Sequence, residues 1–263
     1  MSRQPVLREL DDSGVLLVTL NRPEKKNAFD DPQWDGLADA LREAREDGRV
    51  AAVVVTGAGQ DFSAGQDLGA FAKAAEPRQD GHTSGYHACM ESVVAFDKPL
   101  LAAARGVGVG IGATFLFHCD IVYVGESVRL RLPFVSLGLV PEGASSYLLQ
   151  QVVGSRQAAE LFYSAEWIDA ARAVEVGIAT ARFPDDALLE ATLARAREIA
   201  QWPVGALRAT KRTLLAAHAA GIQAALEAED AGMSAQAGSP ENMEAVRAFL
   251  EKRPPDFKAL RSR

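Results

Sequence analysis

The pattern of apolar and polar positions predicts short buried strands that alternate with amphipathic helices. Residues 51–56 (A-A-V-V-V-T) and 99–104 (P-L-L-A-A-A) are nearly continuous apolar runs, which is typical of strands buried on both faces of a sheet. Residues 32–47 instead have apolar side chains at helical spacing, with Trp34 and Leu37 on one face. The chain therefore combines the elements of an α/β fold.

The same periodicities, with turn residues between them, predict the other elements. Further strands are expected at 6–10, 15–20, 121–124 and 178–183. Further helices are expected at 86–96, 156–163, 169–176, 187–201, 203–218, 222–236 and 240–249. A polar segment with little apolar content covers 69–85, and the tail after 203 has no predicted strand. Because a strand-strand-helix unit repeats, we expect a spiral of such units rather than a doubly wound sheet.

Four glycines at alternate positions follow the predicted strand at 99–104 and precede an apolar run that predicts a buried helix. They are Gly106, Gly108, Gly110 and Gly112. Without side chains in the way, backbone N–H groups at a helix N-terminus can approach a ligand oxygen and favour negative charge on it. An oxyanion hole is built in this way. A loop that only packs a helix tightly against a sheet explains the spacing equally well.

This stretch also formally fits a dinucleotide-binding fingerprint, G-x-G-x-x-A at Gly108, Gly110 and Ala113. However, the next strand at 121–124 begins after roughly two helical turns, and no acidic residue stands about 20 positions on to hold a ribose. A second turn of small residues, D-F-S-A-G-Q-D-L at 61–68, follows another predicted strand. Two such turns can aim two N–H groups at one point, which favours the oxyanion interpretation.

Four motifs together resemble the enoyl-CoA hydratase/isomerase (crotonase) superfamily, over nearly the whole chain. D-F-S-A-G-Q-D-L at 61–68 is similar to the family segment F-x-x-G-x-D-L. A-R-G-V-G-V-G-I-G-A-T-F-L-F-H-C-D at 104–120 resembles N-G-x-A-x-G-G-G-x-x-L-x-x-x-C-D. R-P-E-K-K-N-A-F at 22–29 and F-L-E-K-R-P-P-D-F at 249–257 complete the match.

The resemblance implies a crotonase-like spiral of ββα units and a helical tail. The spiral, with the CoA and catalytic site, is expected over 1–200, and a C-terminal helical oligomerisation region over 201–263. In the family such a tail makes trimer contacts, so a homotrimer or a dimer of trimers is expected. Phe249 and Lys252 match a phenylalanine and a lysine that reach CoA, often in a neighbouring subunit. A solvent-facing lysine on a surface helix is the alternative for Lys252.

The resemblance also assigns backbone donors and ligand contacts residue by residue. The two oxyanion donors of the family fall on the N–H groups of Gln66 and Ile111. The polar loop at 22–29, otherwise a solvated surface loop, matches a family loop that lies along CoA. Asp67 is also explained as a helix cap. The implied substrate and CoA contacts are Lys25, Lys26, Ala28, Ala64, Gly65, Gln66, Asp67, Leu68, Gly110, Phe134, Phe249 and Lys252.

One acidic residue remains where the family places its chemistry. The two glutamates of family hydratases correspond here to Thr114 and Phe134, so both carboxylates are missing. Glu142 lies in P-E-G-A-S-S-Y, which closely resembles the P-E-G-C-S-S-Y segment of peroxisomal-type Δ3,Δ2-enoyl-CoA isomerases, where this glutamate is the single base. From the residues alone, Glu142 is better explained as a carboxylate at a helix N-terminus that begins at Pro141, and the resemblance reverses this preference.

The resemblance therefore implies a Δ3-Δ2-enoyl-CoA isomerase with Glu142 as its base. One carboxylate can move a proton from C2 to C4, whereas hydration needs two acid-base groups. A hydratase-like or thioester hydrolase activity, with Glu142 activating water, is a weaker alternative. A non-catalytic acyl-CoA binder with the same fold is another. No cofactor is expected, because coenzyme A is part of the substrate.

Composition limits the partners and the compartment. The 263 residues carry a formal net charge of −7, which argues against nucleic acid as the main partner. The two cysteines, Cys89 and Cys119, form neither a disulfide framework nor a metal-binding spacing. No apolar run of about 18 residues predicts a membrane span, and no signal peptide is indicated after Met1. A cytoplasmic protein with no metal and no membrane partner is expected.

Overall fold

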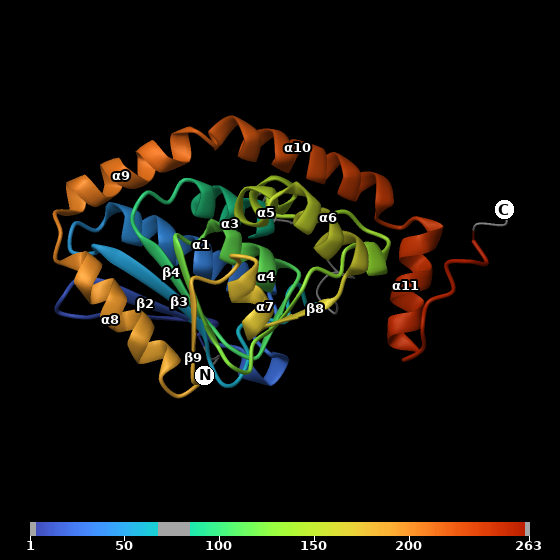
Figure 1. Ribbon diagram of the computed structural model, residues 1–263, viewed down its shortest axis with the longest axis horizontal. Coiled ribbons are helices and arrows are strands. Elements are labelled where there is room, and N and C mark those ends of the chain that lie inside the picture. The colour runs from blue at the N-terminus through green and yellow to red at the C-terminus, as the bar shows by residue number, and fades with distance from the viewer. Residues whose placement is uncertain (1–3, 68–84, 261–263) are drawn as a thin grey trace.

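Two sheets form the centre of the molecule (Figure 1). The computed structural model describes residues 4–67 and 85–260. The larger sheet has the order β1-β2-β3-β4-β6-β9 and consists of Val6–Leu10, Val15–Leu20, Ala52–Gly57, Leu100–Ala104, Ile121–Gly125 and Ala181–Phe183. Its strands are parallel from β2 onwards, and β1 is antiparallel to β2. The smaller sheet has the order β5-β7-β8 and consists of Val107–Val109, Arg129–Arg131 and Trp167–Asp169.

Helices surround both sheets. The α-helices are α1 Asp31–Glu46, α3 Gly85–Val94, α4 Ile111–Thr114, α5 Ser145–Val153, α6 Ser155–Ser164, α7 Ala170–Glu175, α8 Leu188–Ala200, α9 Val204–Ala216, α10 Ala219–Gln236 and α11 Pro240–Leu250. The described ranges also contain the 3₁₀ turns η1 Pro23–Lys25, η2 Phe115–His118 and η3 Val135–Leu137. In Figure 1, α9 and α10 form an arch over the body, and α11 lies at its far edge. No helix among the described residues combines the length and apolarity that a membrane span requires.

The central strands of the larger sheet are buried on both faces, which explains their continuous apolar sequences. In β3, Val53 and Val55 belong to the main core, which also contains the apolar side chains of α1 and α3. Ala52 and Val54 point the other way, into a second core that α8 covers. Because side chains alternate between the faces of a strand, both sets must be apolar. β3 therefore lacks the solvent-facing polar side chains that a strand exposed on one face would have.

The chain winds as a spiral between the two sheets. β4 of the larger sheet leads into β5 of the smaller one, and β6 leads into β7 in the same way. The turn after β3 follows this course, because Ser63 forms a parallel bridge with Gly108 of β5. Gln66 forms a further parallel bridge with Phe29. Each turn of the spiral thus adds one segment to the larger sheet and one segment to or beside the smaller sheet, and a helix follows. This confirms the predicted crotonase-like spiral.

Several predicted boundaries are wrong. The buried helix after the glycines is short, because α4 passes directly into η2 and Asp120 then returns the chain to Leu100 of β4. The strand expected at 178–183 contains only its last three residues, since the Ala179 N–H bonds to Ala173 of α7 rather than to a strand. The three-residue strands of the smaller sheet are too short to show a period in the sequence. Leu68 and nearly all of the polar segment at 69–85 lie outside the described residues.

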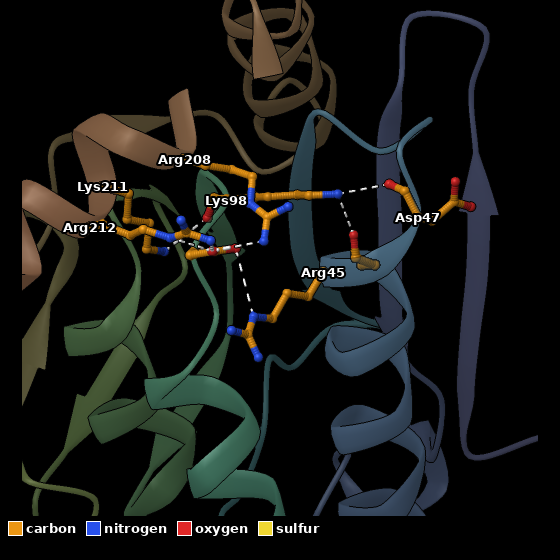
Figure 2. Close-up of polar contacts among 8 residues, drawn as sticks. Arg45, Asp47, Lys98, Arg208, Lys211 and Arg212 are labelled. Carbon is orange, nitrogen blue, oxygen red and sulfur yellow. Dashed lines mark hydrogen bonds and ion pairs between the residues drawn. The ribbon is translucent and has the colours of Figure 1, made fainter. Parts of the chain in front are cut away.

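Ion pairs attach α9 to the body of the molecule. Arg208 and Arg212 of α9 and Arg45 of α1, labelled in Figure 2, converge on one carboxylate. This is the carboxylate of Asp97, at nitrogen–oxygen distances of 2.9, 2.8 and 3.9 Å. Next to them, Lys211 bonds to Asp120 at 2.8 Å. These ion pairs join the start of the helical tail to the segments that lead into β4 and β6. The boundary predicted at residue 200 and the role of the tail in oligomerisation stay predictions.

Candidate active site

The turn after β3 and the turn between β5 and α4 pack directly against each other. The backbone of Ser63 exchanges hydrogen bonds with Val107 and Val109 of β5, each of 3.0 Å. At Gly65, φ is +88°, and a Cβ there would lie 2.5 Å from the carbonyl oxygen of Val109. At Gly112, a Cβ would lie 2.2 Å from the carbonyl oxygen of Ser63. Only glycine permits such an approach at both positions, so the small residues serve the contact that the sequence suggested.

This contact brings the two predicted oxyanion donors onto neighbouring segments. Phe29 bonds to the residues on either side of Gln66, donating to the Gly65 carbonyl at 2.7 Å and accepting from the Asp67 N–H at 2.8 Å. The Gln66 N–H therefore points away from Phe29, and it has no backbone acceptor among the described residues. The Gln66 side chain accepts from Trp34 Nε1 at 3.0 Å. The Ile111 N–H opens α4 directly after Gly110.

The loop at 22–29 lies against the first of these turns. The carbonyl of Lys26 accepts from the N–H of Ala64 at 2.9 Å, and Lys26 Nζ lies 3.9 Å from Asp61. Asn27, fully buried, donates to backbone carbonyls at Ala58 and Asp61. The predicted contacts Lys25, Lys26 and Ala28 thus lie on a loop joined to the segment that carries Ala64, Gly65 and Gln66. Asp67 pairs with Arg22 at 3.1 Å, and the helix that it would cap lies outside the described residues.

Glu142 lies over the second turn. A Cβ placed on Gly110 would be 3.5 Å from Glu142 Oε1. A Cβ on the next residue, Gly143, would be 3.3 Å from Thr114 Oγ1 and 3.5 Å from Ile111 Cδ1. The predicted helix start at Pro141 is wrong, because Gly143 and Ala144 have positive φ and α5 begins only at Ser145. Glu142 is therefore not in the first turn of a helix, and its carboxyl is beside the glycine turn instead.

The surroundings of Glu142 shift its protonation. Desolvation, together with the nearby carboxyl of Glu229, raises the pKa of Glu142 to about 7, although the Ile111 N–H favours the charged form. A carboxyl group with a pKa near neutrality can both accept and release a proton under physiological conditions. This is the property that a single acid-base residue requires.

The side chains that hold the Glu142 segment were not among the residues expected from the sequence. Tyr86 Oη of α3 accepts from the Gly143 N–H at 2.8 Å, and His118 Nε2 lies 2.7 Å from the Gly143 carbonyl oxygen. Burial lowers the pKa of His118 to about 4, so the ring is neutral and donates from Nε2. Glu229 of α10 bonds to the backbone just beyond Gly143. One signal was available, because Glu229 follows Ile222 and Ala225 at the spacing of a buried helical face.

The positions of the two family hydratase glutamates contain no carboxylate. Thr114 is fully buried, and its Oγ1 has no hydrogen-bond partner among the described residues. Phe134 is buried, with its ring centroid 6.3 Å from that of Phe162. Glu142 is thus the acidic side chain placed beside the glycine turn, and the nearby Glu229 carboxylate is engaged by backbone N–H groups.

Two predicted CoA contacts lie elsewhere in the chain. Phe249 is 60% exposed at the end of α11, and Lys252 is exposed just beyond it with φ of +54°. Figure 1 shows α11 at the edge of the molecule, well apart from α4. Within one chain, these two residues are therefore not brought to Gln66, Ile111 and Glu142. Their proposed role requires a neighbouring subunit.

A ββα spiral whose glycine-containing turns pack against each other is the crotonase fold. The sequence profile described as Enoyl-CoA hydratase/isomerase matches residues 11–260, and the chain belongs to this family. It is therefore an acyl-CoA-processing enzyme of the crotonase superfamily.

Individual relatives include hydratases and isomerases. The chain is 34% identical to 2,3-dehydroadipyl-CoA hydratase of Escherichia coli, over 93% of this chain and 95% of the relative. It is 31% identical to enoyl-CoA delta isomerase 2 of Rattus norvegicus, over 92% of this chain and 63% of that protein. The crystal structure of an enoyl-CoA hydratase/isomerase from Pseudoalteromonas atlantica superposes with a TM-score of 0.91 at 35% identity, covering 96% of this chain and 99% of the other.

Proposed function

We propose that this enzyme is a Δ3-Δ2-enoyl-CoA isomerase and that Glu142 is its single acid-base residue. The observation that carries the proposal is the position of Glu142 beside Gly110 and Ile111, with a pKa near neutrality. The similarity to enoyl-CoA delta isomerase 2 supports the same reaction. The substrate class follows from the family, and the position of the double bond is the specific part of the proposal.

The reaction would proceed by two proton transfers. The Glu142 carboxylate removes a proton from C2 of a 3-enoyl-CoA, and the C2–H electron pair enters a dienolate whose charge lies largely on the thioester oxygen. The protonated Glu142 then gives a proton to C4, so the double bond moves from C3–C4 to C2–C3. No water is consumed and no redox change occurs. One carboxyl over both carbons therefore suffices.

The backbone N–H groups of Gln66 and Ile111 would stabilise the dienolate oxygen. Both belong to backbone fixed by neighbouring hydrogen bonds, so little reorganisation is needed when the charge forms. Loss of one such donor typically costs on the order of 10²–10³ in rate. The contact between Ile111 and Glu142 would place C2 near the base when the thioester oxygen occupies the donor site.

Substrate contacts are proposed from the loops around these donors. Lys25, Lys26 and Ala28 would lie along CoA, and Ala64, Gly65, Asp67, Leu68 and Gly110 would line the thioester. Phe134 would contribute an apolar wall. Phe249 and Lys252 would reach CoA bound by another subunit of a homotrimer or a dimer of trimers. The enzyme would act in the cytoplasm with no cofactor beyond the CoA of its substrate.

Hydration is the second candidate, because a hydratase is among the relatives. It needs one group to activate water and another to protonate C2. Glu142 could supply only one of these, and Thr114 and Phe134 cannot supply the other. The Thr114 hydroxyl, which has no hydrogen-bond partner in the described part of the chain, could hold a water molecule and so allow slow hydration.

Direct comparison of two substrates distinguishes the candidates. Purified enzyme is incubated with trans-3-hexenoyl-CoA, with formation of conjugated 2-enoyl-CoA followed by absorbance, and separately with crotonyl-CoA, with loss of conjugation followed. We expect isomerisation to exceed hydration by at least about 10²-fold, the scale of one missing acid-base group. Faster hydration than isomerisation would contradict the proposal. Tight binding of both esters with turnover of neither would instead identify a non-catalytic acyl-CoA binder.

A further inference from the structure

A buried glutamate of the C-terminal helical arch contacts the backbone that follows Glu142. Glu229, on α10, is 6% exposed. Its Oε2 accepts from the N–H of Ala144 at 2.7 Å, and its Oε1 accepts from the N–H of Ser146 at 2.8 Å. Both carboxylate oxygens are therefore committed to the chain directly after the proposed base.

These bonds replace a missing helix cap. Ala144 is the N-cap of α5 and has no side chain that could accept a hydrogen bond. The first N–H groups of a helix need acceptors, and a negative charge is favoured near them. Glu229 supplies both from a distant part of the chain. Because Ala144 has a φ of +56°, an uncommon conformation for alanine, the surrounding contacts must hold it.

The contacts on this segment come from three elements. Tyr86 of α3 accepts from the Gly143 N–H, and His118 of η2 bonds to the Gly143 carbonyl oxygen. Glu229 holds the next N–H along the chain, and it is the charged member of this set. Among the described residues, no hydrogen bond joins the Glu142 side chain to Tyr86, His118 or Glu229, so its position follows from the backbone that these residues fix.

We propose that Glu229 is a positioning residue for the catalytic step. From α10, it fixes the backbone that follows Glu142, so that the Glu142 carboxyl stays beside the turn that carries the Ile111 N–H. The inference rests on the proposed role of Glu142. It also assigns the helical tail a task within its own subunit, besides any task in oligomerisation. Removal of Glu229 would release Ala144 and Ser146 and let the Glu142 carboxyl move away from C2.

The charge of Glu229 would also act on Glu142, and other titratable groups surround the pair. Tyr86 and His118 face it from α3 and η2, with the tyrosine kept neutral and the histidine uncharged. Asp230 on α10 lies 3.4 Å from His87 and adds negative charge. His218 bonds to Tyr147 of α5. Because Glu229 disfavours ionisation of Glu142, its neutralisation should make Glu142 ionise at lower pH.

The test compares Glu229→Gln and Glu229→Ala with the control Glu227→Gln, which makes the same change at an exposed site of α10. With trans-3-hexenoyl-CoA, we expect kcat to fall about 10-fold for Glu229→Gln and up to about 10²-fold for Glu229→Ala, the scale of a displaced catalytic group. KM should change less than about 3-fold. The rising limb of kcat/KM in Glu229→Gln should move to lower pH. Wild-type kcat and an unmoved pH profile in a folded Glu229→Gln variant would overturn the proposal.

Residue-resolved amide hydrogen exchange tests the contact without using the reaction. In the wild type, the Ala144 amide should exchange slowly, because Glu229 is its acceptor in the described structure. In Glu229→Ala, the amides of Ala144 and Ser146 should exchange at least about 10-fold faster, with Glu227→Gln unchanged. If the wild type shows no isomerase activity, the proposed function fails but this measurement still stands. A rapidly exchanging Ala144 amide in the wild type would overturn the positioning role, even if the Glu229 variants do not fold.

Discussion

The carboxyl group of Glu142 lies beside the backbone N–H of Ile111, so the proposed base and one proposed oxyanion donor are immediate neighbours. Gly143 and Gly110 permit this approach, because neither has a side chain to separate the two segments. When a thioester oxygen is bound at the Ile111 N–H, C2, the carbon next to the thioester carbonyl carbon, would therefore lie close to the Glu142 carboxylate.

The pH dependence of kcat/KM should report the ionisation of Glu142. The base must be deprotonated to act, and burial raises its pKa to about 7. Activity of the free enzyme should therefore rise as pH increases through 7 and level off above about pH 8. Initial rates with trans-3-hexenoyl-CoA at subsaturating concentration check this. A profile that is flat between pH 5 and 9 would exclude Glu142, with this pKa, as the base.

Replacement of Gln66 should separate its backbone from its side chain. Gln66→Ala keeps the N–H but leaves the buried Trp34 Nε1 without its acceptor, which should cost about 1–3 kcal/mol of stability with only a modest change in kcat. Gln66→Pro removes the N–H and should lower kcat by about 10² or more. Thermal unfolding and circular dichroism establish that both variants are folded. Equal loss of kcat in the two would show that the side chain, not the N–H, is the active part.

Neutralisation of Glu142 should stabilise the fold at alkaline pH. The folded protein holds the Glu142 proton more tightly than the unfolded chain, whose carboxyl has the usual pKa of 4.5. Stability is therefore lost as pH rises from 4.5 through 7. Glu142→Gln does not suffer this loss, so its Tm should exceed that of the wild type at pH 8 and match it near pH 5. A lower Tm of the variant at pH 8 would show that the ionised carboxylate stabilises the fold.

Salt should weaken the binding of CoA esters more than that of pantetheine esters. Lys25 and Lys26 on the loop at 22–29, with Lys252 from another subunit, would attract the CoA phosphates, and such attraction is screened by ions. Dissociation constants of a saturated acyl-CoA and the matching acyl-pantetheine are measured between 50 and 500 mM NaCl. Equal salt dependence of the two ligands would remove the phosphate contacts from the account.

The elements that the sequence predicts well are those with a clear period. The buried strands around Val53 and Leu101, the amphipathic α1 and the helices of the tail are all present at nearly their expected positions. The spiral was also correctly predicted, because the motifs at 61–68 and 104–120 identify the family. Such patterns depend on local sequence, so they can be recognised without the structure.

Tertiary contacts explain what the sequence could not predict. The β5, β7 and β8 strands form because the spiral brings them together, since three residues show no period of their own. The N-terminus of α5 is set by Glu229 and by positive φ at Ala144, so Pro141 and Glu142 did not mark it despite their favourable residue types. Tyr86 and His118 likewise gain their roles only through Gly143. The roles of Gln66, Ile111 and Glu142 in catalysis stay predictions.

The most direct test of the central claim is the isomerase activity of Glu142→Gln. The substitution keeps the size of the side chain but removes the proton acceptor, so turnover of trans-3-hexenoyl-CoA should fall by about 10²–10⁴. The dissociation constant of a saturated acyl-CoA should change little, and the control Glu160→Gln, at an exposed site on α6, should keep wild-type activity. Loss of turnover with binding retained is the predicted result. Near wild-type isomerisation by Glu142→Gln would contradict the account and place the base elsewhere.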